Sequence, residues 1–252
     1  MKNVLICVDF QNDFLEGGNF EVKGGLKDVQ NTINFINNHK IDKIICSLDM
    51  HVKNQIFFSS YWIDKNGKHP DPFTIISNHD IKDEKWLPVN KNKAYALEYT
   101  NKIEENGQRQ LCIWPYHCLI GSKGAALENN LFNCIFENFD YDMIEKGQDL
   151  DSEMYGFIKP EYSRKDLTNY KVLEKLKEYD NVFVAGEAAS HCVLDSVKQI
   201  AEYYKDNQDF LKKITILKDC TSVISGYEEI TNTEFEKLKL LGIKIIESTK
   251  IL

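Results

Sequence analysis

Short apolar runs rich in β-branched residues alternate with amphipathic segments along most of the chain. This alternation is typical of a parallel β-sheet flanked by helices. The apolar runs predict six strands, at residues 3–8, 43–48, 142–145, 181–185, 214–217 and 243–246. We therefore expect an α/β fold with a doubly wound, mostly parallel six-stranded sheet and helices on both faces.

Two of the intervening segments have apolar residues at helical spacing, namely Leu26, Val29, Ile33 and Ile36 in the first and Val193, Val197, Ile200 and Tyr204 in the second. Such spacing places the apolar side chains on one face of a helix. Both segments are expected to pack that face against the sheet.

Residues 61–110 interrupt this rhythm, because the segment is polar, irregular and rich in Lys, Asn, Asp and Pro. A stretch of this length without regular structure is uncommon inside a compact domain unless it has a function. We expect residues 1–252 to form one domain, in which residues 61–110 are an insertion that serves as a lid, a small subdomain or an oligomer contact.

Composition narrows the class of partner. Of the 252 residues, 42% are hydrophobic and 28% are charged, and no apolar run approaches the roughly 18 residues that a membrane span requires. The net charge of -8 disfavours nucleic acid, which is bound through clustered Lys and Arg. We expect a small-molecule ligand, with neither nucleic acid nor membrane as a partner, and the sequence leaves a homo-oligomer open.

The chain opens with MKNVLICVDF and continues into a polar QND, without the small-residue cleavage site of a secretory signal. Its seven cysteines are scattered and include no C-x-x-C pair, which argues against a disulfide framework and a zinc ribbon. Free thiols and a cytoplasmic location are therefore expected.

Reactive side chains follow several predicted strands at the point where each strand ends. Ligands of open α/β sheets bind beyond the carboxyl ends of the strands. The residues at these ends are Asp9, Asp49, His51, Lys146 and Cys192. We expect them to converge on one edge of the sheet.

Cys192 lies in VAGEAASHCV, between a predicted strand and a predicted helix. A thiol at a helix N-terminus meets the positive end of the helix dipole, which lowers its pKa and favours the thiolate. Cys192 is therefore the candidate nucleophile, and the adjacent His191 is expected to be a surface or pocket-wall residue. A small buried side chain is the better interpretation of Cys7, Cys46, Cys134 and Cys220.

Asp9 is the candidate base for this thiol. Desolvation would raise the pKa of its carboxyl group, while Lys146 would hold the group ionised, and this combination suits a carboxylate that shuttles one proton. A turn cap is the alternative role, since Asn12 and Asp13 follow.

In SLDMH, Asp49 and His51 stand two residues apart, which places both side chains on one face of an extended segment. A carboxylate and an imidazole so placed can begin a metal site, and His117 of WPYHC supplies a further ligand. These three residues predict a site for one divalent metal.

The motifs VDFQNDF, LDMH, IWPYHCLIGSKGA, EKG and VAGEAASHCV occur in the order and character of the isochorismatase-like cysteine hydrolases. WPYHC and the D-x-H pattern resemble the nicotinamidase/pyrazinamidase branch most. The resemblance covers nearly the whole chain apart from residues 61–110, and it implies the isochorismatase-like hydrolase fold.

The resemblance also implies the roles of individual residues. It implies a catalytic triad of Asp9, Lys146 and Cys192, an oxyanion hole from the backbone N–H groups of Ala188 and Cys192, and a cis peptide bond between Glu187 and Ala188. The implied metal is zinc, or else iron or manganese, bound by Asp49, His51 and His117. The implied substrate pocket contains Phe14, Trp114 and Tyr155, for which plain core packing is the alternative.

The expected activity is hydrolysis of a small aromatic amide, most simply nicotinamide to nicotinate and ammonia in NAD salvage. Three departures from the branch bear on it: Gln55 stands where a second histidine is usual, Ser190 where an aspartate is common, and the motif after the lysine is shortened at residues 155–157. A related hydrolase of another small amide or N-carbamoyl substrate is the alternative. The alternative of another class is a non-catalytic small-molecule binding protein.

Overall fold

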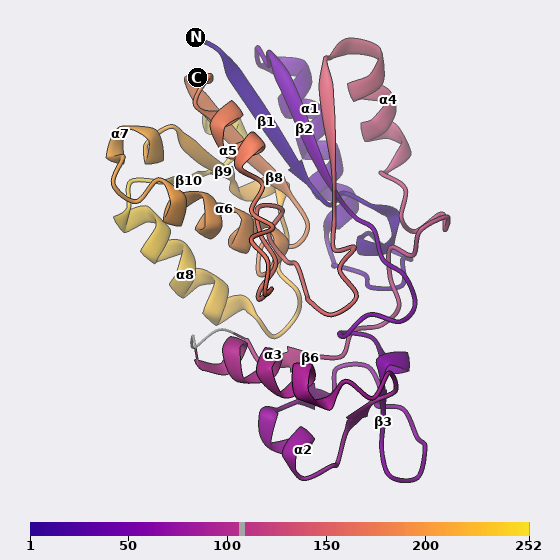
Figure 1. Cartoon of the computed structure of the whole chain (residues 1–252). Helices are drawn as coiled ribbons and strands as arrows, with labels where there is room; N and C mark the ends of the chain where they lie inside the picture. The colour runs from indigo at the N-terminus through magenta and orange to yellow at the C-terminus, as the bar shows by residue number, and fades with distance from the viewer. Residues whose placement is uncertain (106–108, 252) are drawn as a thin grey trace.

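The computed structural model describes residues 1–105 and 109–251. Its central sheet contains the six predicted strands, which are β1 (Asn3–Val8), β2 (Lys43–Asp49), β7 (Tyr141–Lys146), β8 (Asn181–Gly186), β9 (Ile214–Leu217) and β10 (Lys244–Ile246). The strand order is β10-β9-β8-β1-β2-β7, and every neighbouring pair is parallel (Figure 1). The predicted fold class is confirmed.

Helices cover both faces of this sheet (Figure 1). On one face pack α1 (Gly25–Asn38) and α4 (Asn129–Asn138). The other face is covered by α5 (Tyr170–Leu176), α6 (Cys192–Tyr203), α7 (Gln208–Leu211) and α8 (Glu228–Leu240). Single turns of 3-10 helix occur at Asn12–Phe14, Ser59–Tyr61, Lys218–Cys220 and Ser248–Lys250.

The predicted apolar stripe of α6 is fully buried against the sheet, but that of α1 is wrong at one position. Val29 and Ile36 are buried, whereas Leu26 is 48% exposed. In this first turn Gly25 faces the core instead, and a Cβ atom there would lie 2.7 Å from Leu15 Cδ2. The close approach of the turn to the core therefore excludes a side chain at the core-facing position.

Residues 61–110 contain regular structure where they are described; residues 106–108 of this predicted insertion lie outside the described part. The elements are α2 (Asn78–Lys82), α3 (Lys93–Glu105) and two antiparallel pairs, β3 (Trp62–Ile63) with β5 (Leu87–Pro88) and β4 (Ile75–Ile76) with β6 (Leu111–Cys112). They surround a separate apolar cluster that includes Trp62, Ile76, Ile81 and Tyr99. This layer lies beyond the carboxyl ends of the sheet strands (Figure 1), and its status as an insertion stays a prediction.

Apolar side chains fill the space between the sheet and the helices on each of its faces. The additional layer has its own apolar cluster, and the carboxyl ends of the strands face this layer. Among the residues described, no helix combines the length and apolar character that a membrane crossing needs.

Candidate active site

The predicted reactive residues meet at β1, where the strand order of the parallel sheet switches from one side to the other. Asp9 follows β1, Asp49 ends β2 and Lys146 ends β7, so all three stand at carboxyl ends of adjacent strands. Cys192 begins α6, just after β8 on the other side of β1. Such a switch point is where open α/β sheets bind their ligands.

Lys146 lies at the centre of this group. Its Nζ atom is 3.0 Å from Asp9 Oδ2 and 3.7 Å from Cys192 Sγ, and it donates to an oxygen of Asp49 and to the Met154 carbonyl at 3.0 Å. The Lys146 and Asp9 side chains are completely buried. The two carboxylates and the thiol lie within 4.8 Å of one another.

The two oxygens of Asp9 have different surroundings. Oδ1 accepts a hydrogen bond from Ser47 Oγ at 2.6 Å. Oδ2 pairs with Lys146 by charge but has no hydrogen-bond donor among the described residues. Oδ2 is therefore the oxygen that can accept a proton. The alternative role of Asp9 as a turn cap explains neither the contact with Ser47 nor the contact with Lys146.

The site drives the pKa values of its two aspartates in opposite directions. Burial raises the pKa of Asp9, although Lys146 opposes the rise. Asp49 is also buried, but Lys146 and His51 more than compensate for this burial and hold the pKa of Asp49 well below its usual range. Burial favours the neutral form of Lys146, yet Asp49 and Asp9 outweigh it and raise the lysine pKa well above its ordinary value. Asp49 and Lys146 thus stay charged, and Asp9 can exchange a proton.

The expectation of a lowered pKa at Cys192 is wrong. Burial raises the pKa of this thiol well above its usual value, and Asp9 and Asp49 add to the rise, which Lys146 only partly offsets. The desolvation of the thiolate outweighs the helix terminus. At rest Cys192 is a neutral thiol, so its activation requires a base.

Two backbone donors lie beside the thiol. The peptide bond between Glu187 and Ala188 is cis, as predicted. The Ala188 carbonyl accepts from the N–H groups of His191 and Val193, at 3.0 and 3.2 Å. In the described part of the chain, the N–H groups of Ala188 and Cys192 have no partner. They are available to an oxygen atom of a ligand.

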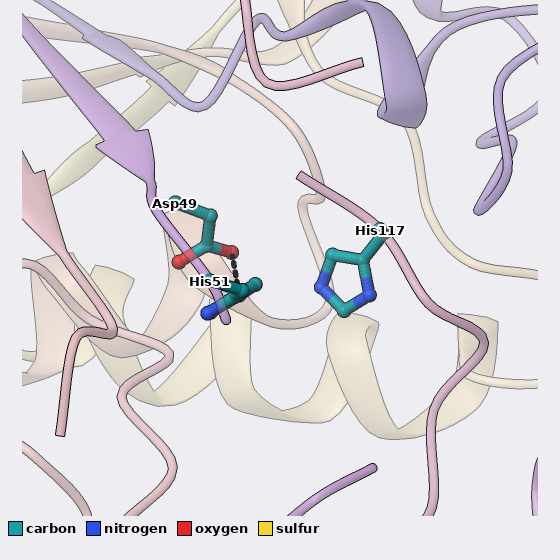
Figure 2. A group of neighbouring side chains, drawn as sticks. All are labelled: Asp49, His51 and His117. Atoms are coloured by element: carbon teal, nitrogen blue, oxygen red, sulfur yellow. Dashed lines mark ion pairs between the residues drawn. The ribbon is translucent and has the colours of Figure 1, made fainter. Parts of the chain in front are cut away.

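The predicted metal ligands also come together. Asp49, His51 and His117 are all buried, and one donor atom of each lies within 4.8 Å of the other two. Figure 2 shows His117 facing the Asp49–His51 pair from a different segment of the chain. Nδ1 of His51 is 3.0 Å from the Gly147 carbonyl and Nδ1 of His117 is 2.8 Å from the Pro115 carbonyl. Both imidazoles are therefore oriented by a backbone acceptor, as is usual for ligating histidines, and direct Nε2 toward the proposed metal position, where Nε2 of His51 lies 3.5 Å from Asp49 Oδ2.

Gln55, the residue in place of an expected second histidine, is no ligand but a brace for this site. Its Nε2 donates to the carbonyls of Gly147 and Asp149 at 2.6 and 2.8 Å, and its Oε1 accepts from Val52 N–H at 3.0 Å. Because Gly147 also accepts from His51, Gln55 fixes the acceptor that orients a proposed ligand.

A narrow cavity opens beside Cys192 and His117. Its walls include the predicted aromatic residues together with others, namely Phe14, Phe20, Trp114, Tyr155, Glu153, Ala188, His191 and Ile224. A larger surface hollow nearby is lined by residues of the segment 159–168 and by α6, but it contains none of the predicted site residues. The narrow cavity is the better candidate because it contains the thiol and two of the proposed metal ligands.

Sequence patterns did not reveal Glu153. Its carboxyl group is buried in the cavity wall, where it accepts from Trp114 Nε1 at 3.1 Å, and burial raises its pKa to about 7. Trp114 Nε1 is also 3.2 Å from the Tyr155 hydroxyl. Glu153 lies in an irregular, acidic segment after Lys146, where no periodicity separates an inward carboxylate from an exposed one.

Fold and site define a doubly wound α/β protein with a buried Asp–Lys–Cys group beside a candidate metal site. The nicotinamidase of Saccharomyces cerevisiae is 24% identical over 246 residues, which cover 96% of this chain and 98% of that protein. The yeast nicotinamidase structure with the inhibitor nicotinaldehyde aligns with a TM-score of 0.69 and 22% identity, over 97% of this chain and 99% of that one. No protein-family model matches the chain.

A pyrazinamidase structure from Pyrococcus horikoshii, in complex with zinc, aligns with a TM-score of 0.60 and 21% identity, over 98% of this chain and 99% of that one. These comparisons confirm the predicted fold and the resemblance to the nicotinamidase/pyrazinamidase branch of the isochorismatase-like hydrolases.

Proposed function

We propose that this protein is a metal-assisted cysteine amidase that hydrolyses nicotinamide to nicotinate and ammonia. The observation that carries the proposal is the buried Asp9–Lys146–Cys192 group, whose thiol lines one cavity together with Asp49 and His117 of the candidate metal site. The full-length similarity to a nicotinamidase supports the choice of substrate.

The first half of the reaction forms a thioester. Asp9 Oδ2 takes the proton of the Cys192 thiol, and the thiolate attacks the carbonyl carbon of the amide. The free N–H groups of Ala188 and Cys192 stabilise the oxyanion, a contribution often worth about 3–4 kcal/mol per donor. Asp9 then returns the proton to the leaving nitrogen, which departs as ammonia.

The second half regenerates the thiol. Water attacks the thioester carbon and gives one proton to Asp9; the C–S bond breaks, and Asp9 returns this proton to the thiolate of Cys192. Lys146 stays charged throughout, so it offsets the negative charge of Asp49 together with that of either Asp9 or the Cys192 thiolate, whichever of the two is ionised.

Asp49, His51 and His117 would hold one divalent metal ion, for which we propose zinc because one carboxylate and two imidazoles are a common zinc donor set. When bound, the ion supplies a Lewis acid and an anchor for a basic ring nitrogen of the substrate.

The test is ammonia release from nicotinamide by the purified protein, with Cys192→Ala as the inactive control. Turnover that disappears in this variant supports the proposal. Absence of turnover by protein that contains its metal, together with failure of iodoacetamide to label Cys192, would favour a binding protein.

A further inference from the structure

Two buried carboxyl groups face each other behind the proposed oxyanion loop. Glu187 precedes Ala188 in this loop and is 0% exposed, and Asp28 of α1 is 5% exposed. Both carboxyl groups lie at the start of α1, where a Cβ atom at Gly25 would be 3.4 Å from Glu187 Oε1 and one at Gly24 would be 4.0 Å from Asp28 Oδ2. Each group raises or lowers the pKa of the other, as expected of carboxyl groups that share a hydrogen bond. No donor from the rest of the described chain reaches Glu187 Oε1 or Asp28 Oδ2. A proton held between the two groups satisfies both orphaned oxygens at once.

The surroundings do not supply a countercharge. In the part of the chain that is described, no Lys, Arg or His nitrogen lies within 4.0 Å of either carboxyl group. The charged neighbours that face the pair are Glu16, from the loop before α1, and Lys27 of α1, and both are exposed. Two ionised carboxylates buried together without a partner are strongly unfavourable, so one stays neutral.

The proton belongs to Glu187. Burial and the neighbouring Asp28 raise the pKa of Glu187 well above its usual value. Burial also raises the pKa of Asp28, but hydrogen bonds from Ser222 and Glu187 limit the rise. Glu187 therefore donates, and Asp28 accepts.

This pair is tied to the backbone that carries the proposed oxyanion donors. Ser222 N–H donates to Glu187 Oε2 at 3.3 Å, and Ala189 N–H donates to the Ser222 carbonyl at 2.8 Å. Ser222 thus holds both the side chain before Ala188 and the backbone after it. Asp28 connects the same point to α1.

We propose that Glu187 is a positioning residue, which fixes the Ala188 donor of the oxyanion hole through a proton shared with Asp28. The inference rests on the proposed function and deepens it. Loss of this proton at alkaline pH places two like charges in contact and displaces the loop, so the Glu187–Asp28 pair sets an upper pH limit on turnover.

The same proton affects folding in a defined direction. Because the pKa of Glu187 is raised in the folded state, the native protein binds more protons than the unfolded chain above the ordinary glutamate range. The protein therefore becomes less stable as pH rises from that range to the folded-state pKa of Glu187. Over this interval the equilibrium constant for unfolding increases about tenfold per pH unit.

The experiment compares Glu187→Gln, which keeps a donor and removes the titration, with Glu187→Leu, which keeps the bulk and removes both. Glu178→Gln, at an exposed glutamate in the turn that follows α5, is the control. We expect Glu187→Gln to retain kcat within about threefold at pH 7.5 and to lose less activity than wild type between pH 8 and 9.5. Glu187→Leu should lower kcat at least tenfold at all pH values, with little change in KM, since oxyanion donors act on the transition state.

Identical pH profiles of wild type and Glu187→Gln would overturn the proposal, as would an equal loss of kcat in Glu187→Gln and Glu187→Leu. Urea unfolding between pH 5.5 and 9.5 tests the pair without any substrate. A flatter stability profile in Glu187→Gln than in wild type supports the shared proton, and equal slopes contradict it. Failure to hydrolyse any amide would refute the proposed function but leave this stability comparison valid.

Discussion

Asp9 Oδ2 lies 3.0 Å from Lys146 Nζ, and neither side chain has any exposure to solvent. The pair is not isolated, because the carboxylate of Asp49 forms a second ion pair with the same ammonium group. The group therefore keeps an ion pair even when Asp9 is neutral, which is what a carboxylate that accepts and returns a proton requires.

The Asp9→Asn variant should separate the two effects of this carboxylate on the thiol. Turnover should fall about 10²–10⁴-fold, because general base catalysis is lost. Alkylation of Cys192 by iodoacetamide should become faster at pH 7.5, because Asp9 raises the pKa of the thiol and its charge is removed. The measurements are ammonia release and the rate of mass addition at Cys192. Slower alkylation would mean that Asp9 already holds the thiol proton in the resting enzyme.

The metal site predicts a graded response to substitution. His117→Ala should abolish stoichiometric metal binding, because it removes one of three ligands. Gln55→Leu should weaken binding about 10–100-fold, since it releases the Gly147 carbonyl that orients His51. Elemental analysis and competition with a chelator give both values, and His79→Ala, at a histidine that is 81% exposed, is the control. Full metal content in His117→Ala would remove this residue from the site.

His191 presents an unused polar atom to the cavity. Its Nδ1 is 2.8 Å from Ser190 Oγ, which accepts from Ile224 N–H, while Nε2 is buried without a partner among the described residues. Burial and Arg109 lower the pKa of His191 well below its usual value, so the ring is neutral. With the Ser190 hydroxyl donating to Nδ1, the ring proton lies on Nε2 and is available to a substrate.

His191→Phe should therefore raise KM for nicotinamide about 5–20-fold with a smaller change in kcat, in keeping with the loss of one hydrogen bond. The check is steady-state kinetics, with His69→Phe, outside the cavity, as the control. An unchanged KM would show that the Nε2 proton does not contact the substrate.

The sheet was predictable because its strands are buried and apolar, and the catalytic residues were predictable because they stand at strand ends. Asp9, Asp49 and Lys146 could be placed by this rule alone. The rule failed for the pKa of Cys192, because the sequence shows a helix start but not the depth of burial or the two nearby carboxylates. The prediction that Leu26 is buried was wrong for a related reason, since periodicity does not show how closely the first turn of α1 approaches the core.

Functional residues that do not stand at strand ends could not be predicted from the sequence pattern. Glu153 and Arg109 lie in irregular segments far from Cys192 in sequence, and only the packing of those segments brings Glu153 into the cavity wall and Arg109 against Tyr155. In the sequence Glu187 is part of a loop motif, and the role of its carboxyl group depends on α1, which places Asp28 beside it.

Arg109 holds the segment around Cys192 through contacts on both sides of this residue. Its guanidinium group donates to Asp195 of α6 and to the Ser190 carbonyl, and its Cζ atom lies 5.0 Å from the centre of the Tyr155 ring. The side chains of Arg109 and Asp195 are only 27% and 14% exposed. Arg164 offers a matched control, because it pairs with Glu98 and lies 5.0 Å from the Tyr95 ring but is 59% exposed.

Arg109→Ala should destabilise the fold by about 3 kcal/mol, because it leaves Asp195 buried without a partner, and Tm should fall by roughly 6–12 °C. Arg164→Ala should cost under about 1 kcal/mol, as for other exposed pairs. Adding Asp195→Asn to Arg109→Ala should restore part of the stability but not the activity, since Ser190 and Tyr155 still lack their partner. Thermal unfolding and KM measurements check both statements, and equal effects of the two arginine variants would mean that burial of the Arg109 pair has no energetic consequence.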